Sequence, residues 1–349
     1  MKTDSAQKPV IGWFCTYTPE ELILAAGLES RRILGDAAGM AAADTYLHPN
    51  LCAFVRACFG SLLNNPNSFA GVVGIDSCDA MRRLFDACRH FLPVQFSHIL
   101  ALPHEVNEDA VQFFHAELQA FTPALRTYSG NNLNDDNLLR AIAITNETRL
   151  ILSELDELRR APTGIVASQY YRILRQSMAS DKKEFNRAWR GRLQQLRESN
   201  PASREGARVV LSGGVLDDMW IVETIEAAGG HVVADDLCCG SRYFGGLVRT
   251  DGDPLLQIAE RYIRRLPCAR MNTTGKRIDH LLELVRQTNA TGLIYYSVKF
   301  CDPHTLDWVM IQPELQRMRI PALRCEADYS PGNREQIRTR IEAFLEMLS

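Results

Sequence analysis

Short apolar runs alternate with amphipathic stretches over the first hundred residues of the chain. The apolar runs are rich in β-branched and aromatic residues, which is typical of buried strands, and the stretches between them have the spacing of amphipathic helices. The predicted strands are residues 9–15, 70–75 and 94–100, and the predicted helices are residues 22–28, 53–62 and 79–89. Strands that alternate with helices in this way pair as a parallel sheet. The pattern therefore predicts an α/β lobe.

The middle of the chain has a different pattern. Leu, Ala, Arg and Glu recur at helical spacing, and we find no convincing strand there. The helices predicted in this part are residues 104–121, 135–160, 164–178 and 182–199. We interpret this part as a helical section that packs on the first lobe, and the polar segment 198–203 that follows it as a linker.

The last third returns to alternating strands and helices. Strands are predicted at residues 208–211, 230–236, 291–297 and 320–326, and a final helix at residues 332–347. The sequence thus predicts an α/β protein with two Rossmann-like lobes and parallel sheets, joined by a helical section. The predicted boundaries are 1–103 for the first lobe, 104–200 for the helical section and 201–349 for the second lobe.

Composition narrows the possible classes of protein. The net charge of the 349 residues is −3, so the chain lacks the basic surplus typical of proteins that bind nucleic acid. No apolar run approaches the roughly 18 residues of a membrane helix, and residues 1–9 lack the apolar core of a secretory signal. We therefore expect a cytoplasmic protein. Its ten cysteines would then stay reduced, either as small buried side chains or as metal ligands.

Three of the cysteines share one predicted environment, the opening of a helix. Cys78 follows a strand and precedes a helix, Cys301 is followed by a capping Asp302 and by Pro303, and Cys52 directly precedes another predicted helix. Backbone N–H groups and the helix dipole stabilise thiolates, and thiolate-bound clusters, at such positions. The compact Cys-x-x-Cys spacing of ferredoxins and zinc sites does not occur, so spacing alone does not identify a metal.

The order of five short motifs along the chain resembles that of a known family. The motifs are Cys-Ala-Phe-Val-Arg at 52–56, Asp-Ser-Cys-Asp at 76–79, Asp-Asp-Leu-Cys at 235–238, Lys-Phe-Cys-Asp-Pro at 299–303 and Arg-Thr-Arg-Ile-Glu-Ala-Phe at 338–344. Together with the opening segment 11–21, they resemble the 2-hydroxyacyl-CoA dehydratase / benzoyl-CoA reductase subunit family. The likeness extends over nearly the whole chain.

This resemblance implies a function and a cofactor. In the family, three cysteines of one subunit hold a [4Fe–4S] cluster where the two lobes meet, and these correspond to Cys52, Cys78 and Cys301. The resemblance further implies a radical reaction of an acyl-CoA thioester, an oxygen-sensitive cluster with one iron open to water or substrate, a homologous partner subunit in a dimer, and an ATP-hydrolysing activator that delivers one electron.

Two alternatives remain open. A related branch of the family holds a double-cubane cluster and reduces small molecules in an ATP-coupled reaction. Further ligands would then come from Cys58, Cys238, Cys239 or Cys325. The second alternative is a subunit without catalytic activity of its own, which holds a cluster for a partner. The chain is on the short side for the family, so we expect it to lack an insertion that shapes the substrate pocket.

Several other residues have simpler interpretations. Cys88 is nearly three helical turns from Cys78, so we expect it in the core. The Ser-Gly-Gly turn at 212–214 is a candidate contact for a CoA phosphate, although a tight turn also explains it. Glu20 and Glu21 follow Thr18 and Pro19 with the spacing of a helix cap, which we favour over a role as acid or base. The histidines show no paired metal-ligand spacing.

Overall fold

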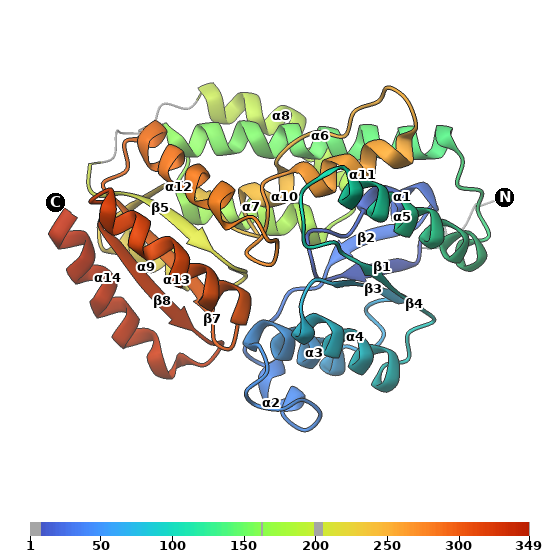
Figure 1. The fold of residues 1–349 in the computed structure, drawn as a ribbon, viewed down its shortest axis with the longest axis horizontal. Coiled ribbons are helices and arrows are strands. Elements are labelled where there is room, and N and C mark those ends of the chain that lie inside the picture. The colour runs from blue at the N-terminus through green and yellow to red at the C-terminus, as the bar shows by residue number, and fades with distance from the viewer. Residues whose placement is uncertain (1–7, 162, 199–204, 349) are drawn as a thin grey trace.

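Two parallel four-stranded sheets form the framework of the computed structural model, which describes residues 8–161, 163–198 and 205–348. The sheets lie at opposite ends of the molecule, and the long helix α6 (Asp135–Arg160) runs along both of them (Figure 1). The predicted α/β class with two Rossmann-like lobes is confirmed. The boundaries at 103/104 and 200/201 stay predictions, and the proposed linker 198–203 and most of the N-terminal segment 1–9 lie outside the described residues.

The first lobe contains a sheet with the strand order β2-β1-β3-β4. Its strands are β1 (Val10–Trp13), β2 (Glu29–Arg32), β3 (Gly71–Asp76) and β4 (Phe96–Ala101), and its helices are α1 (Glu20–Ala25), α2 (Gly39–Ala43), α3 (Ala53–Asn64) and α4 (Asp79–Phe91). All strand pairs are parallel, so the carboxyl ends of the strands meet at one edge of the sheet. The predicted strands and helices of this part are present, with ends that shift by a few residues.

Strand β2 is an element that the sequence pattern did not predict. Its sequence, Glu-Ser-Arg-Arg, has no apolar residue, but it pairs in register with β1 at the edge of the sheet. Ser30 and Arg32 alternate with more exposed neighbours and are almost fully buried. The Arg32 guanidinium donates through Nε to the Phe14 carbonyl at 3.2 Å and through Nη1 to the Cys238 carbonyl at 3.1 Å. Tertiary contacts, rather than propensity, therefore form this strand.

Four helices occupy the middle of the chain, close to their predicted positions: α5 (Glu108–Ser129), α6, α7 (Ala167–Ala179) and α8 (Lys182–Glu198). The side chains of Asn107 and Asn134 accept hydrogen bonds from the first turns of α5 and α6, and Gly130 ends α5 in the left-handed conformation with φ 69°. Helix α5 packs on β4, whereas α6 contacts both α1 and β6. At 26 residues, α6 is about 39 Å long and spans the two lobes.

The second lobe repeats the topology of the first, with the strand order β6-β5-β7-β8. Its strands are β5 (Arg208–Gly213), β6 (His231–Asp236), β7 (Gly292–Val298) and β8 (Ala322–Ala327). Helices α9 (Trp220–Ala227), α13 (Asp302–Arg317) and α14 (Arg334–Leu348) pack against this lobe, and a short 3-10 turn, Pro331–Asn333, precedes α14. The four strands and the last helix agree with the sequence prediction.

Between β6 and β7 the chain crosses back to the first lobe. Sequence reasoning assigned no element there, yet the structure has α10 (Ser241–Phe244), α11 (Pro254–Arg264) and α12 (Thr274–Thr288). Helix α11 packs along α5 and α6, beside the first lobe (Figure 1). Its start carries a recognisable signal, because the Asp253 side chain accepts from Leu255 N and Pro254 occupies the first turn. Residues from late in the chain thus pack on both lobes.

The predicted cap at the start of α1 is wrong. The helix begins at Glu20 with Pro19 at the N-cap position, and the Thr18 hydroxyl has no hydrogen-bond partner among the described residues. Both glutamates are buried and bind the segment that crosses back. Tyr243 donates to Glu20 at 2.8 Å, Tyr262 donates to Glu21 at 3.0 Å, and Arg149 forms an ion pair with Glu21. These carboxylates therefore join the lobes.

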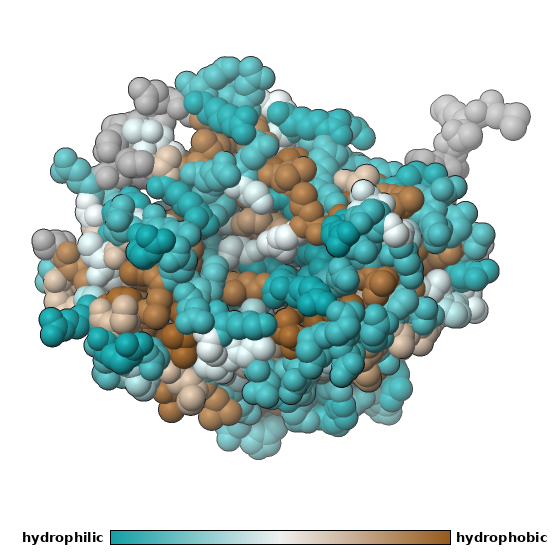
Figure 2. Space-filling view, turned by 45° about the horizontal axis from the view of Figure 1, so that its top comes forward, coloured by the Kyte–Doolittle hydropathy of each residue, from teal (hydrophilic) through white to brown (hydrophobic). Residues whose placement is uncertain are grey.

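The surface is mainly polar, with apolar residues in small separate patches on the face that Figure 2 shows. No helix in the described part of the chain is both long enough and apolar enough to cross a membrane.

Candidate metal centre

The three cysteines selected from the sequence occupy equivalent local positions. Cys52, Cys78 and Cys301 are the N-cap residues of α3, α4 and α13. Cys78 and Cys301 follow β3 and β7, which hold the same place in their two sheets. The predicted helix openings are therefore confirmed, but Asp302, which we expected to cap α13, is instead the first residue of this helix. Each sulfur lies beside backbone N–H groups that have no partner within the helix.

A contact between the lobes aligns two of these openings. The Ala53 N–H, at the start of α3, donates to the Lys299 carbonyl at 3.1 Å. Phe300, between Lys299 and Cys301, has a left-handed backbone with φ 60°, which few residues other than glycine adopt. This turn ends β7 and directs the chain into α13. It brings Cys301 next to Cys52 although the two residues are far apart in the sequence.

All three cysteines line one cavity of about 90 Å³ between the lobes. The same cavity is lined by six of the ten cysteines: Cys15, Cys52, Cys78, Cys238, Cys268 and Cys301. Most of the other lining side chains are apolar, including Phe14, Val55 and Val298, so the site has few groups that could hold water. The cavity is thus lined by soft sulfur donors and by apolar side chains, a combination that suits iron–sulfur clusters and thiophilic ions.

The cavity also contains fixed positive charge. Arg32 is buried at its edge, and Arg270 lines it from the loop before α12. A cluster bound by thiolates is anionic, and buried guanidinium groups with helix N-termini would lower the free energy of such a charge. The site can therefore accommodate an anionic centre away from water.

Cys52 and Cys301 form a hydrogen-bonded pair. The hydrogen bond from Cys301 lowers the pKa of Cys52 below its usual value, against the effect of burial, and the backbone N–H groups of Val55 and Phe54 lower it further. The same hydrogen bond, together with burial, raises the pKa of Cys301 well above its usual value. For Cys78, burial raises the pKa to about 11, although the Met81 N–H acts in the opposite direction. Of the three cysteines, Cys52 is thus the one whose surroundings favour the thiolate form.

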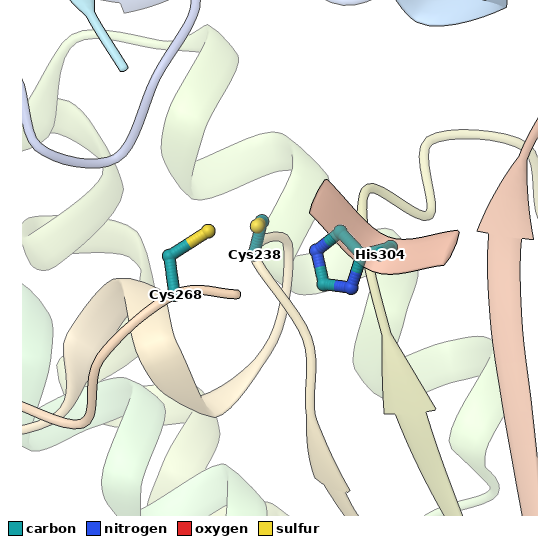
Figure 3. Close-up of side chains that lie close together, drawn as sticks. All are labelled: Cys238, Cys268 and His304. Carbon is teal, nitrogen blue, oxygen red and sulfur yellow. The ribbon is translucent and has the colours of Figure 1, made fainter. Parts of the chain in front are cut away.

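A second group lies on the other side of the cavity. The Sγ atoms of Cys238 and Cys268 and a ring nitrogen of His304 all lie within 4.8 Å of one another, and Figure 3 shows the two sulfurs and the imidazole turned toward each other. The hydrogen bond from Cys268 lowers the pKa of Cys238 well below its usual value; burial opposes this, and the positive charge of Arg242 adds to it. Here too one sulfur of a pair is stabilised as a thiolate.

Only one of the four cysteines considered as extra ligands lines the cavity, and that is Cys238. Cys58 is buried and its Sγ lies 3.7 Å from the Ile33 carbonyl, while Cys239 and Cys325 are buried elsewhere. Burial raises the pKa of Cys239 to about 11 and that of Cys325 to about 12, as expected for inert core thiols. Cys88 is fully buried in the core, as predicted.

The turn at Ser212, Gly213 and Gly214 is not an open cradle for phosphate. Ser212 is fully buried, and the Gly213 carbonyl accepts a hydrogen bond from Arg242. A side chain at Gly214 would meet the His304 ring, because a Cβ there would lie 3.1 Å from Cδ2 of the imidazole. The tight-turn interpretation is therefore correct, and the glycines allow close packing beside the cavity.

Sequence reasoning missed Cys15, Cys268 and His304 as lining residues. Cys15 had a signal, since it lies just beyond the carboxyl end of β1. His304 had a weaker one, because it is the third residue after Cys301 and so lies in the same first helical turn. Cys268 precedes a helix that the pattern did not reveal, and no local signal marks it.

Comparison with known proteins identifies the family. The family described as 2-hydroxyglutaryl-CoA dehydratase, D-component, matches residues 15–348. The chain belongs to this family. This confirms the predicted resemblance, and the D-component match covers both lobes and all six cysteines of the cavity.

Curated relatives of this D-component family member include subunits of dehydratases and of a reductase. The chain is 26% identical to the (R)-phenyllactyl-CoA dehydratase beta subunit of Clostridium sporogenes, over 97% of the chain and 91% of the relative. It is 24% identical to one of the benzoyl-CoA reductase subunits of Thauera aromatica, over 99% and 92%. It is 26% identical to the beta subunit of (R)-2-hydroxyglutaryl-CoA dehydratase of Acidaminococcus fermentans, over 98% and 93%. The protein is therefore an enzyme subunit of this kind, and the names imply a partner subunit.

Proposed function

We propose that this protein is the iron–sulfur subunit of a radical 2-hydroxyacyl-CoA dehydratase or a related acyl-CoA reductase. In this proposal Cys52, Cys78 and Cys301 hold one [4Fe–4S] cluster, in a cytoplasmic protein whose thiols stay reduced. The observation that carries it is that these three cysteines, each at the N-terminus of a different helix, line one apolar cavity between the lobes. Three thiolates leave one iron of a cubane without a protein ligand.

The protein's own residues would have three tasks. Cys52, Cys78 and Cys301 would bind the irons, and the helix N-termini together with Arg32 would stabilise the negative charge. The apolar walls of the cavity would exclude water from the reacting centre. When bound, the cluster would supply a low-potential electron and an open iron for the thioester carbonyl of an acyl-CoA.

The proposal includes two protein partners. A homologous subunit would complete a dimer, as the names of the relatives suggest, and an ATP-hydrolysing activator would deliver the electron. Cys78 and Cys301 are half-buried and Phe300 is 44% exposed, so the edge of the cavity is close to the surface. Light scattering should show a dimer, with itself or with a homologous partner. A monomer at micromolar concentration that recruits no partner from its native host contradicts this part.

Metal analysis of protein purified without oxygen tests the cofactor. We expect about four irons and four sulfides per chain, the content of one cubane. Replacement of Cys52 by Ala should abolish cluster retention, whereas Cys88→Ala, which changes a buried thiol elsewhere in the core, should retain it. Zinc without iron, or an unchanged iron content in Cys52→Ala, would refute the assignment. Binding of a 2-hydroxyacyl-CoA ester, measured by calorimetry, tests the substrate.

A second candidate function is supported by the three additional cysteines in the cavity. Cys15, Cys238 and Cys268 would be the protein ligands of a second cubane, which would make the protein an ATP-coupled double-cubane reductase of small molecules. An iron content near eight per chain, with matching sulfide, identifies this alternative.

A further inference from the structure

Behind the His304 imidazole lies a buried chain of polar groups. His304 Nδ1 lies 2.8 Å from the Tyr295 hydroxyl, and that hydroxyl donates to Asp307 Oδ2 at 2.7 Å. Asp307 is bound in turn by Arg277, through Nε at 3.1 Å and Nη2 at 2.8 Å. Arg277 is fully buried and also contacts Asp236 at 3.2 Å, so the whole chain is fixed within the second lobe.

This chain determines which nitrogen of His304 carries the proton. Asp307 is paired with Arg277 and is ionised, so it can only accept hydrogen bonds. The single Tyr295 proton therefore goes to Asp307 at 2.7 Å, because this carboxylate has no proton to give, and not to His304 Nδ1 at 2.8 Å or to the His304 carbonyl at 3.2 Å. The Tyr295 oxygen must then accept from Nδ1–H of His304. The second nitrogen, Nε2, keeps its lone pair.

The free lone pair is directed at sulfur. Figure 3 shows the ring nitrogen of His304 that faces Cys238. Gly214 lets the ring pack closely, because a Cβ there would lie only 3.1 Å from Cδ2. Metal-binding histidines commonly donate their other N–H to a carboxylate, a carbonyl or water, which fixes the tautomer and the ring orientation. Here Tyr295 and Asp307 together have that role. His304 thus has the arrangement of a preset metal ligand.

The spacing of the donor atoms fits a single ion. Bonds of about 2.0 to 2.3 Å around a tetrahedral ion separate its ligand atoms by about 3.3 to 3.8 Å. The three donor atoms already lie within 4.8 Å of one another, so a small inward movement would complete the site. Cysteines that bind a cubane attach to different irons and lie further apart. Two thiolates and one imidazole suit zinc or ferrous iron, and they leave a fourth position open.

We propose that Cys238, Cys268 and His304 bind a single thiophilic divalent cation, zinc or ferrous iron, with Tyr295 and Asp307 positioning the imidazole. The site is separate from the Cys52, Cys78 and Cys301 group and does not depend on the function proposed above. Its open position faces the same cavity.

Metal and sulfide analysis of the full-length protein, purified without oxygen, is the first test. We expect one zinc or iron per chain in addition to the four irons of the cluster, which are accompanied by an equal number of sulfides. His304→Ala and Cys268→Ser should lose this ion and keep the cluster, and elemental analysis distinguishes zinc from iron. The matched control is His90→Ala, which removes an exposed imidazole from α4. X-ray absorption at the edge of the bound metal should show two sulfur ligands and one nitrogen ligand.

Zinc affinity provides the second test, by competition with a chromophoric chelator. His304→Ala should weaken zinc binding at least 100-fold. Tyr295→Phe keeps the ring of His304 but removes its partner, so a loss of about 10- to 100-fold is expected. Circular dichroism confirms that each variant is folded. An affinity that is unchanged in His304→Ala overturns the proposal, and so does a wild-type protein that binds no zinc at micromolar concentration.

The outcomes separate this site from the cluster. Cys78→Ala should lose the four irons and keep the single ion, so failure of one assignment leaves the other standing. Eight irons with matching sulfide and no further ion would overturn the single-ion site and support the double cubane.

Discussion

The two lobes have the same strand order and contribute three cysteines each to the cavity, but they differ in the residues that follow two corresponding elements. In the first lobe Cys15 lies two residues after the end of β1, whereas the corresponding strand β5 of the second lobe is followed by Gly214 and then by Val215. Three residues after the capping cysteine, the first lobe has Met81 and the second has His304. The first lobe thus has a thiol and a thioether at positions where the second lobe has a valine, beside a glycine, and an imidazole.

This difference shows how one topology can arrange the residues of the two sites proposed above. The repeated part, a strand followed by a cysteine at a helix N-terminus, places Cys78 and Cys301 equivalently. The part that is not repeated depends on space, since the absence of a side chain at Gly214 is what allows His304 to approach the sulfurs. The repeated elements therefore suit the cluster, and the divergent ones suit the single ion.

The largest expected effect comes from the equivalent cysteines. Cys78→Ala and Cys301→Ala should each abolish retention of the four irons, because each removes one of three thiolates. Equal losses in the two variants, measured as iron and sulfide per chain after anaerobic purification, would support the equivalence of the lobes. Full retention of iron in either variant would contradict the equivalence of the lobes.

Next in size is a change in the buried ion network around Arg277 in the second lobe. Arg277→Met leaves the carboxylates of Asp236 and Asp307 buried without their partner, which should lower the free energy of unfolding by about 3–5 kcal/mol. Urea unfolding at pH 7 measures this difference. Arg249→Ala, which removes an exposed ion pair with Asp251, is the control and should change stability by less than about 1 kcal/mol.

The stability of Arg277→Met should change with pH in the opposite direction to that of the wild type. Burial raises the pKa of Asp307, but the charge of Arg277 outweighs this and holds it below its usual value. In the wild type this carboxylate contributes stability above about pH 4, and the contribution is lost as the pH falls further. Without Arg277, burial raises the pKa of Asp307. Protonation of Asp307 then removes a buried, unpaired charge and stabilises the variant. The difference in free energy of unfolding between wild type and variant should therefore decrease as the pH falls from 7 to 5. A constant difference would contradict this account.

A smaller effect is expected at Gly214. The Cβ of Gly214→Ala would lie 3.1 Å from His304 Cδ2, so the ring must move by a few tenths of an ångström. We expect a loss of about 1 kcal/mol in stability and weaker zinc binding, with the cluster unaffected. Gly275→Ala is the matched control, since a Cβ there meets nothing within 4 Å. Equal zinc affinities in the two variants would show that Gly214 does not determine the position of His304.

The smallest effect is expected at the first-lobe counterpart of His304. Met81→Leu conserves volume and removes no ligand, so stability should change by less than about 1.5 kcal/mol and both metals should remain. Metal analysis and urea unfolding check this. Loss of iron in Met81→Leu would indicate that the Met81 sulfur helps to hold the cluster.

The helix openings at Cys52, Cys78 and Cys301 could be predicted because their signals are local, such as a preceding apolar strand or Asp302 and Pro303 after the cysteine. Strand β2 could not be predicted, since its polar sequence becomes a strand only because it pairs with β1. Cys268 and His304 become a pair only when distant segments pack together. Sequence periodicity describes single elements, whereas these contacts depend on how the two lobes meet.

The segment that crosses back between β6 and β7 has a consequence for biosynthesis. Tyr243 and Tyr262 reach the glutamates of α1, and Arg265 donates to the Thr16 hydroxyl at 3.0 Å, so the first lobe is completed by residues made long after it. On a ribosome, the N-terminal sheet emerges well before these partners, and Cys301 is added only after 300 other residues. A nascent chain therefore exposes Cys52 and Cys78 before their third companion exists. Insertion of the cluster proposed for these three cysteines would therefore follow translation, and the unpaired thiols would have to stay reduced until the chain is complete.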